Sequence, residues 1–335
     1  MPDKLPADTS LASMAPAPSG LGATVLLFGE VLVDCFPDRE VEGGAPFNVA
    51  HHLHNLGAGA GISPVLVTRI GKDERGRRLM ESLQRAGLSI EGVQQDCLHP
   101  TGFVDITLDP ETGGHRFDIA PDQAWDFIHA EMSRLVCLSR KPQWIYFGTL
   151  AQRAASRPAL RALLQSPVHG ERAGGFLDIN LRDPWVRKDV LRWSLGKADI
   201  AKVNEEELHR VARMLGFGTG PARELGQRLV QSFALRYLLV TRGEQGAWLL
   251  GSDGGYFHSG ATPPVTDVVD TVGAGDGFAS VFLIGLMRGW PMEQVLARAH
   301  RFAGEICRLR GAIPESPGFY APFLAEWGLS GKGGP

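Results

Sequence analysis

The chain has 335 residues, of which 44% are hydrophobic and 21% are charged, and its formal net charge at pH 7 is -3. This composition is typical of a soluble α/β domain with a large core, and the weak negative charge argues against nucleic acid as a partner. No apolar run reaches the ~20 residues that span a bilayer, so no membrane partner is expected. The four cysteines form no CxxC pair, which favours reduced thiols in a cytoplasmic protein over disulfides or structural zinc.

Residues 1–22 are predicted to be a disordered tail, because residues 10–19 are rich in Ala, Pro and Ser and no apolar signal segment is present. The ordered domain is expected over residues 23–330. Apolar, β-rich runs predict strands at 24–28, 32–36, 64–70, 102–108, 115–119, 144–147, 175–178, 200–203 and 237–241. Helical spacing of apolar residues predicts helices that begin at Pro46 and others at 75–86, 158–165, 205–215, 222–233, 277–288 and 292–308.

Strands that alternate with helices predict an α/β fold with a mostly parallel central sheet flanked by helices. The strands at 102–108 and 115–119 differ, because the turn-rich residues 109–114 (DPETGG) predict that they form a β-hairpin. Such an insertion predicts a small β lid built from about residues 33–45 and 98–122. A lid sheet can expose an apolar face, so a homodimer that pairs through the lid is expected.

The segment 270–277 reads DTVGAGDG and precedes a very apolar stretch. Its small residues Gly273, Ala274 and Gly275 are expected to lead into the N-terminal end of a buried helix, where free backbone N–H groups bind anions. Such a turn can hold a phosphoryl group during its transfer, and Asp276 can take the proton from the attacking hydroxyl. Taken alone, these residues also allow Asp276 to be no more than a helix N-cap.

The segment DTVGAGD closely resembles the C-terminal signature of the ribokinase-like (PfkB-type) carbohydrate kinases. Four further segments resemble that family in the family's order: Gly29-Glu30 with Asp34, 42–50 (EGGAPFNVA), 204–207 (NEEE) and 241–246 (TRGEQG). The resemblance covers roughly residues 24–320. It implies a ribokinase-like fold and ATP-dependent phosphorylation of a sugar hydroxyl by direct in-line attack, with Mg²⁺.

The resemblance also implies roles for residues on the sugar side. Asp34 would accept hydrogen bonds from two sugar hydroxyls, since an ionised carboxylate is only an acceptor. Gly43 and Gly44 would let the sugar lie against the backbone, and the Asn48 amide would reach another hydroxyl.

On the nucleotide side, the resemblance implies that Asn204 and Glu207 act on Mg²⁺ through water, although an acidic helix start explains them equally. The resemblance implies that Thr241, Gly243 and Gly246 lie in a turn that contacts the nucleotide. Taken alone, this turn is an ordinary hairpin. A potassium-type site would be formed by Asp270, Thr271 and the backbone near Gly311.

The choice of sugar depends on residues 178–185 (DINLRDPW), which resemble the D-x-N-x-R…W stretch of fructokinases. The sequence departs from that pattern, because Ile179 replaces a common Pro and the pattern places Trp one residue later than Trp185. Asp178 and Arg182 would take part in substrate binding, and Phe117 would either cover the sugar or make an apolar contact under the lid.

Fructose, phosphorylated to fructose 6-phosphate, is the favoured substrate. Ribose, 2-keto-3-deoxygluconate and a nucleoside stay open, as does a phosphorylated sugar, because Arg39 and Arg116 are available near the lid. A non-catalytic sugar-sensing protein is a second hypothesis. A dehydrogenase is a third, but the chain lacks the Gly-rich turn after the first strand that such an enzyme needs.

Overall fold

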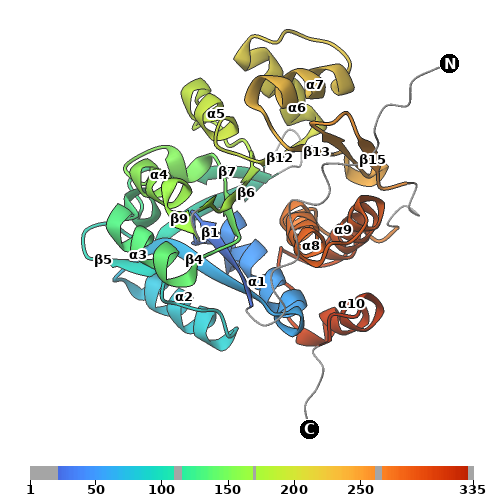
Figure 1. Cartoon of the computed structure of the whole chain (residues 1–335). Helices are drawn as coiled ribbons and strands as arrows, with labels where there is room; N and C mark the ends of the chain where they lie inside the picture. The colour runs from blue at the N-terminus through green and yellow to red at the C-terminus, as the bar shows by residue number, and fades with distance from the viewer. Residues whose placement is uncertain (1–21, 109–114, 169–170, 261–265, 331–335) are drawn as a thin grey trace, which may run out of the picture.

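A nine-stranded sheet forms the centre of the molecule (Figure 1). The structure is a computed structural model that describes residues 22–108, 115–168, 171–260 and 266–330, so the tail predicted for residues 1–22 lies outside it except for Gly22. In spatial order the strands are β15 (Tyr256–His258), β14 (Ala247–Gly251), β13 (Tyr237–Thr241), β12 (Ile200–Asn204), β11 (Gly174–Asp178), β8 (Trp144–Phe147), β1 (Ala23–Phe28), β4 (Ile62–Gly71) and β5 (Val93–Asp96).

The strands from β13 to β5 are parallel, and only β14 and β15 pair antiparallel. The predicted mostly parallel α/β sheet is therefore confirmed. From β1 the chain builds the sheet in both directions, with β4 on one side and β8 on the other. Open parallel sheets bind ligands beyond the carboxyl ends of their strands where the strand order reverses, which directs attention to the ends of β1, β8 and β11.

Helices cover both faces of the sheet, and alternate residues of β1 supply the two cores. Leu26 and Phe28 belong to one core, while Val25 and Leu27 belong to the other. The first core contains residues of α3 (Ala130–Arg140), α4 (Arg157–Gln165), α5 (Lys188–Leu195), α6 (Glu205–Leu215) and α7 (Ala222–Phe233). The second contains residues of α1 (Ala45–Gly57), α2 (Glu74–Arg85), α8 (Ala274–Arg288), α9 (Met292–Ile306) and α10 (Ala321–Trp327).

The helix predicted to be buried is α8, and every residue from Gly277 to Gly285 is buried in it. In Figure 1 it lies beside α9, and α1 and α8 also pack together. None of the helices in the described parts of the chain is long and apolar enough to cross a membrane.

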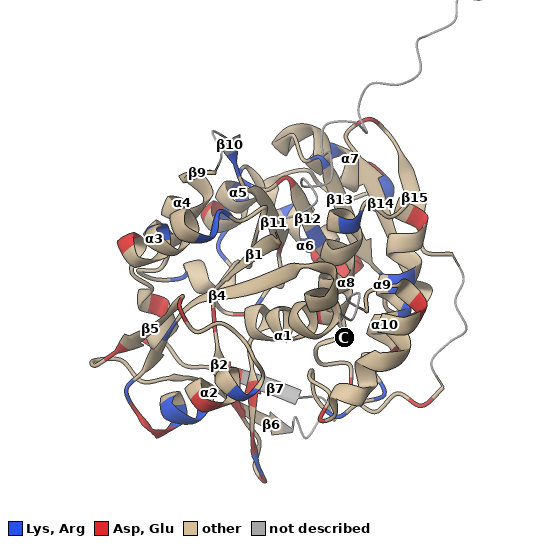
Figure 2. Ribbon diagram, turned by 60° about the horizontal axis from the view of Figure 1, so that its bottom comes forward, with Lys and Arg blue, Asp and Glu red and all other residues tan. Residues whose placement is uncertain are grey.

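A second, four-stranded sheet forms the lid, in the order β3 (Glu40–Gly43), β2 (Leu32–Cys35), β6 (Gly102–Leu108) and β7 (His115–Ile119). The predicted hairpin is confirmed, because β6 and β7 pair antiparallel. Helix α2 is tied to strand β3 by charge: Glu40 accepts from Arg75 Nη2 at 2.8 Å and from Arg78 Nη1 at 3.0 Å. Figure 2 shows charged residues along α2 beside the lid strands.

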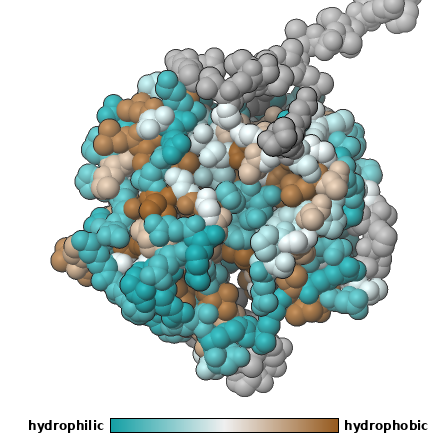
Figure 3. Space-filling model, turned by 90° about the horizontal axis from the view of Figure 1, so that it is seen from below, coloured by the Kyte–Doolittle hydropathy of each residue, from teal (hydrophilic) through white to brown (hydrophobic). Residues whose placement is uncertain are grey.

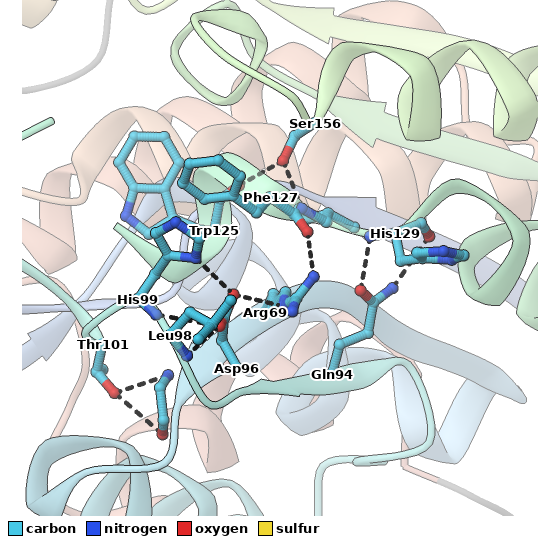
Figure 4. Close-up of polar contacts among 12 residues, drawn as sticks. Arg69, Gln94, Asp96, Leu98, His99, Thr101, Trp125, Phe127, His129 and Ser156 are labelled. Atoms are coloured by element: carbon cyan, nitrogen blue, oxygen red, sulfur yellow. Dashed lines mark hydrogen bonds and ion pairs between the residues drawn. The ribbon is translucent and has the colours of Figure 1, made fainter. Parts of the chain in front are cut away.

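The chain enters the β6–β7 hairpin of the lid through residues 97–101 and leaves it through residues 120–129, and one polar network joins these two connections (Figure 4). Arg69 of β4 forms an ion pair of 2.8 Å with Asp96, where β5 ends, and donates to the carbonyl of Phe127 at 2.6 Å. The ring of His99 stacks on that of Phe127, with the centroids 3.6 Å apart. These contacts hold both connections of the β6–β7 hairpin against the main sheet.

Asp73 joins the start of helix α2 to Thr101, the residue that precedes β6, and its loss should lower the stability of the fold. Its carboxylate caps α2 by accepting from Gly76 N at 2.8 Å, and it accepts from Thr101 N at 2.7 Å and Thr101 Oγ1 at 2.6 Å. Asp73→Ala removes three hydrogen bonds and leaves buried donors unsatisfied, so we expect urea unfolding to show a loss of about 2–4 kcal/mol. Asp253→Ala is the control, because Asp253 accepts one exposed bond from Gly255 N. Equal losses in the two variants would contradict this account.

Candidate active site

The N-termini of α1 and α8 meet above the carboxyl ends of the central strands. Asn48, in the first turn of α1, donates from Nδ2 to Asp276 Oδ2 at 2.8 Å. One turn further along α8, the Ser280 hydroxyl lies 3.4 Å from the carbonyl of Val49. The structure therefore brings together the two helix starts in which the sequence placed sugar binding and phosphoryl transfer.

The turn before α8 leaves the start of the helix free of side-chain caps. The N-cap is Gly273, at φ 80°, and Asp276 lies three residues into the helix with its carboxylate bonded to Asn48. Asp276 is therefore not the helix cap that the sequence alone allowed. The N–H groups of Gly275 and Asp276 have no acceptor in the described parts of the chain. Free N–H groups at a helix N-terminus form an anion-binding site.

Asp276 has the electrostatics of a general base. Burial raises its pKa to about 6, even though the Asn48 hydrogen bond favours the charged form. The negative charge of Asp178 raises this pKa further, while Lys202 and Arg182 lower it. A carboxyl group with a pKa this close to neutrality is ionised at pH 7 and still basic enough to accept a proton.

Two adjacent glycines bring the end of lid strand β3 against the site. A Cβ added to Gly43 would lie 2.5 Å from Asp34 Oδ2, and one added to Gly44, at φ 107°, would lie 2.4 Å from the carbonyl oxygen of Glu30. Burial raises the pKa of Asp34 to about 6, and Arg182 lowers it in part. The exposed side chain of Arg182 thus acts electrostatically on both Asp34 and Asp276.

Asp178 forms the floor of the site. It is buried at the end of β11, and both of its oxygens accept from Lys202 Nζ, at 3.1 and 2.9 Å. Tyr146 donates to Asp178 Oδ2 at 3.2 Å. These three hydrogen bonds give Asp178 a supporting position, and the substrate contact predicted for it stays a prediction.

Residues predicted to act on the nucleotide lie side by side at the carboxyl edge of the sheet. Asn204 and Thr241 are register partners on β12 and β13. Asn204 Oδ1 accepts from Glu207 N at 2.7 Å, and Glu207 Oε2 accepts from Asn204 N at 2.9 Å, so these two residues cap α6. Gly243 and Gly246, at φ 55° and 85°, form the turn of the β13–β14 hairpin.

Phe117 belongs to β7, where it pairs with Ile106, but its side chain lies outside the described part of the structure. The contact expected between Phe117 and the sugar therefore stays a prediction.

Comparison with known proteins assigns the chain to a family. Residues 23–317 match the family described as pfkB family carbohydrate kinase. The chain belongs to this family. It is 28% identical to fructokinase-2 of Oryza sativa subsp. japonica, over 91% of this chain and 96% of that protein.

Solved structures share the fold of this pfkB carbohydrate kinase. The fructokinase of Vibrio cholerae O395 with fructose, ADP and calcium ion bound is 22% identical, with a TM-score of 0.70 over 89% of this chain and 98% of that chain. The 2-dehydro-3-deoxygluconokinase of Thermotoga maritima is 17% identical, with a TM-score of 0.75 over 90% of this chain and 99% of that chain. The predicted ribokinase-like fold and the carbohydrate kinase assignment are therefore confirmed.

The residues of the kinase fit an indirectly bound Mg²⁺. Within the described ranges, no group of three or more His, Cys, Asp or Glu side chains could hold a metal ion. Glu207 accepts from Leu181 N at 2.7 Å as well as from Asn204 N, and each carboxylate oxygen keeps a second lone pair for water. Mg²⁺ commonly keeps several waters and takes its other ligands from nucleotide phosphates.

The two loops predicted to bind a monovalent cation are also joined. Asp270 accepts from Val272 N at 3.0 Å and from Gly311 N at 3.1 Å. The cation ligands predicted from the sequence are thus close in space, with Thr271 between Asp270 and Val272. Ala312, the residue after Gly311, packs against Gly273, so the loops predicted to bind the cation contact the turn that precedes α8.

Sequence analysis did not assign site roles to Glu30, Lys202 or Tyr146. Glu30 follows β1, and burial raises its pKa to about 7 in spite of hydrogen bonds from its own backbone and that of Ala45. It stands in the Gly29-Glu30 segment that resembles the carbohydrate kinase family, and this resemblance is a signal that could have found it. Lys202 and Tyr146 had no such signal, because their partner Asp178 reaches them through strand register.

Proposed function

We propose that this protein is an ATP-dependent fructokinase that transfers the γ-phosphoryl group of MgATP to the 6-hydroxyl of fructose. The observation that carries the proposal is the pairing of a basic carboxylate, Asp276, with the free N–H groups of the α8 N-terminus. The 28% identity to a fructokinase along nearly the whole chain supports fructose as the acceptor.

The sugar would lie between the lid and the start of α1. Asp34 is positioned to accept from two hydroxyls, and the glycine pair Gly43 and Gly44 leaves the backbone open to the ring. Asn48 Oδ1 is buried and has no hydrogen-bond partner within the described structure, so a sugar hydroxyl that donates to it would satisfy it. The positive charge of Arg182 would offset the negative charges of Asp34 and Asp276.

The nucleotide would lie beyond the carboxyl ends of β12 and β13, with its phosphates pointing toward α8. Its proposed contacts are Thr241, Gly243 and Gly246. Asn204 and Glu207 would hold water ligands of Mg²⁺, and a potassium-type ion at Asp270, Thr271 and Gly311 would fix the loop that precedes Gly273.

The transfer is an in-line displacement. Asp276 takes the proton of the sugar hydroxyl, the hydroxyl oxygen forms a bond to the γ-phosphorus, and the bond from that phosphorus to the bridging oxygen of ADP breaks. The α8 N-terminus, with Gly273, Ala274 and Gly275 around it, stabilises the charge on the phosphoryl oxygens. The products are a sugar phosphate, ADP and a proton.

The raised pKa values predict how activity depends on pH. Asp276 and Asp34 both have pKa values of about 6, because burial disfavours their charged forms. Both must be ionised, one to accept the proton and the other to bind hydroxyls, so log kcat/KM should fall below about pH 6 with a slope that approaches two. Initial rates across this range measure the slope, and Asp276→Asn should reduce the slope of its residual activity to one. A flat wild-type profile would contradict the assignment.

The acceptor is tested by ADP release with MgATP and a panel of sugars. Fructose is expected to give the highest kcat/KM, with ribose, 2-keto-3-deoxygluconate, nucleosides and phosphorylated sugars as the competing acceptors. A clear preference for one of these would change the assigned acceptor from fructose to that compound, and the assignment as a kinase would stand. Sugar binding by calorimetry without ADP release would instead support the non-catalytic sugar-sensing alternative.

Pairing of two copies through the lid stays a prediction. The exposed large hydrophobic side chains of the described structure are Leu98, Met132, Leu135, Leu138, Tyr256, Val268 and Val269, and none belongs to a lid strand. Figure 3 shows one face of the molecule, with its hydrophobic residues in separate patches among hydrophilic ones. A lid-mediated dimer would therefore use the backbone edges of β3 or β7, and light scattering of the wild-type protein tests whether it forms.

A further inference from the structure

Lys202 is a buried cation directly beneath the start of α8. It lies on β12, opposite Asp178 in the parallel register, and only 6% of its surface is exposed. A Cβ added to Gly275, in the first turn of α8, would lie 3.3 Å from Lys202 Nζ. The ammonium group is therefore in contact range of the backbone that forms the anion-binding turn.

The start of α8 opposes this cation in part, although Asp178 stabilises it. The N-terminus of a helix carries a partial positive charge, so a lysine beside it is repelled. Burying the Lys202–Asp178 pair also adds little stability, because the cost of removing both charges from water offsets their attraction. Core packing alone therefore does not account for a charged pair in this place. An additional negative group that binds between Lys202 and the start of α8 would account for it, because both attract an anion.

The hydrogen-bonding capacity of Lys202 leaves room for such a group. An ammonium has three N–H donors, and Asp178 is the only acceptor of Lys202 within the described structure. Burial lowers the pKa of Lys202, but the adjacent Asp178 outweighs this and the net pKa lies above the ordinary value. Lys202 is thus a fixed cation, held by Asp178, which Tyr146 in turn orients.

We propose that Lys202 is a catalytic residue of this kinase, which donates a hydrogen bond to the phosphoryl group during transfer and so completes the anion-binding turn of α8. The proposal rests on the proposed kinase reaction but not on fructose as the acceptor. Asp178 and Tyr146 are positioning residues that hold the ammonium group toward Gly275. The donated bond strengthens as negative charge accumulates on the phosphoryl oxygens, so its effect falls on kcat.

The test uses a variant that removes both charges. Lys202→Met alone would leave Asp178 buried and unpaired, which can unfold the protein. The double variant Asp178→Asn/Lys202→Met avoids this, and Glu326→Gln/Arg301→Met, which removes an exposed ion pair of α9 and α10, is the matched control. Loss of one preorganised donor predicts that kcat falls about 10²–10³-fold in the double variant and much less in the control.

A second readout separates catalysis from folding. Binding of ADP with aluminium fluoride, Mg²⁺ and sugar, which imitates the phosphoryl group in transfer, should weaken in the double variant by a factor similar to the loss in kcat. Its affinity for sugar alone and for ADP alone should change little. A double variant with wild-type kcat, or with equal losses in all three affinities, would overturn the role of Lys202. A wild-type protein that phosphorylates no sugar would instead overturn the proposed kinase reaction, so the two failures are distinguishable.

Discussion

Asp276→Asn is expected to lower kcat for sugar phosphorylation by about 10³-fold, because the amide cannot take the proton of the attacking hydroxyl and a general base contributes about 10²–10⁴-fold. The new side chain has nearly the same shape, and its amide oxygen can still accept from Asn48. Sugar affinity should therefore change little. Steady-state kinetics gives kcat, and calorimetry gives the dissociation constant of the sugar.

Asp38→Asn is the matched control for this substitution, since Asp38 is exposed on the turn between lid strands β2 and β3. It should retain wild-type kcat. An Asp276→Asn protein with more than about a tenth of wild-type kcat would show that the hydroxyl proton leaves by another route.

The same substitution should not destabilise the fold. The folded-state pKa of Asp276, about 6, lies above its ordinary value of 3.8, so the folded state holds this proton more tightly than the unfolded state. Wild-type stability therefore falls as the pH rises between these two values, and Asp276→Asn removes that loss. The Tm of the variant relative to wild type should rise over this interval and stay level above it. Lost activity with an unchanged or higher Tm is a catalytic effect.

Gly273→Ala is expected to have the second large effect, a fall in kcat of about 10²-fold or more, because it distorts the anion-binding turn. A Cβ at this position would lie 2.3 Å from Ala312 Cβ and 2.5 Å from Ala312 Cα. Both contacts are far too short, so either the start of α8 or the loop at Ala312 must move. The N–H groups that we propose bind the phosphoryl group would move with that turn.

Gly216→Ala provides the control, because Gly216 has a similar φ of 89° and a Cβ there would meet nothing within 4 Å. Both substitutions place alanine in the left-handed backbone region, which costs about 1 kcal/mol of folding stability, and urea unfolding measures this loss. Only Gly273→Ala should also reduce kcat. Equal kcat values for the two variants would show that the turn is not part of the catalytic site.

The central elements could be predicted because their signals are local. The buried helix α8 contains no charge between Asp276 and Arg288, and the glycine-rich turn stands directly before it. The helices and strands that were not predicted from the sequence lack such patterns: β3, β5, β9 (Pro167–Val168), β10 (Glu171–Arg172), β14, β15, α3, α5 and α10. Strand β5 reads VQQD, and the polar side chain of its buried residue Gln94 bonds to the backbone of His129, which lies 35 residues further along the chain.

The composition of the site was predictable only in part, for a related reason. Asn204 and Glu207 fit both a helix cap and a metal-binding role, and the structure shows that the cap is present. The pair of Asp178 and Lys202 could not be read from the chain, because it depends on which strands become neighbours and on their register. From the sequence, Asp178 was therefore predicted only to take part in substrate binding, and Lys202 was given no role.

The most direct test of this account follows a single turnover by ³¹P NMR, with enzyme in excess over MgATP and fructose present. We expect the γ-phosphorus signal to be replaced by that of fructose 6-phosphate without a phosphoenzyme signal, and we expect Asp276→Asn to stop this conversion while both substrates stay bound. A phosphoenzyme signal would contradict direct transfer to the sugar hydroxyl. Conversion by the Asp276→Asn variant at the wild-type rate would contradict deprotonation of that hydroxyl by Asp276.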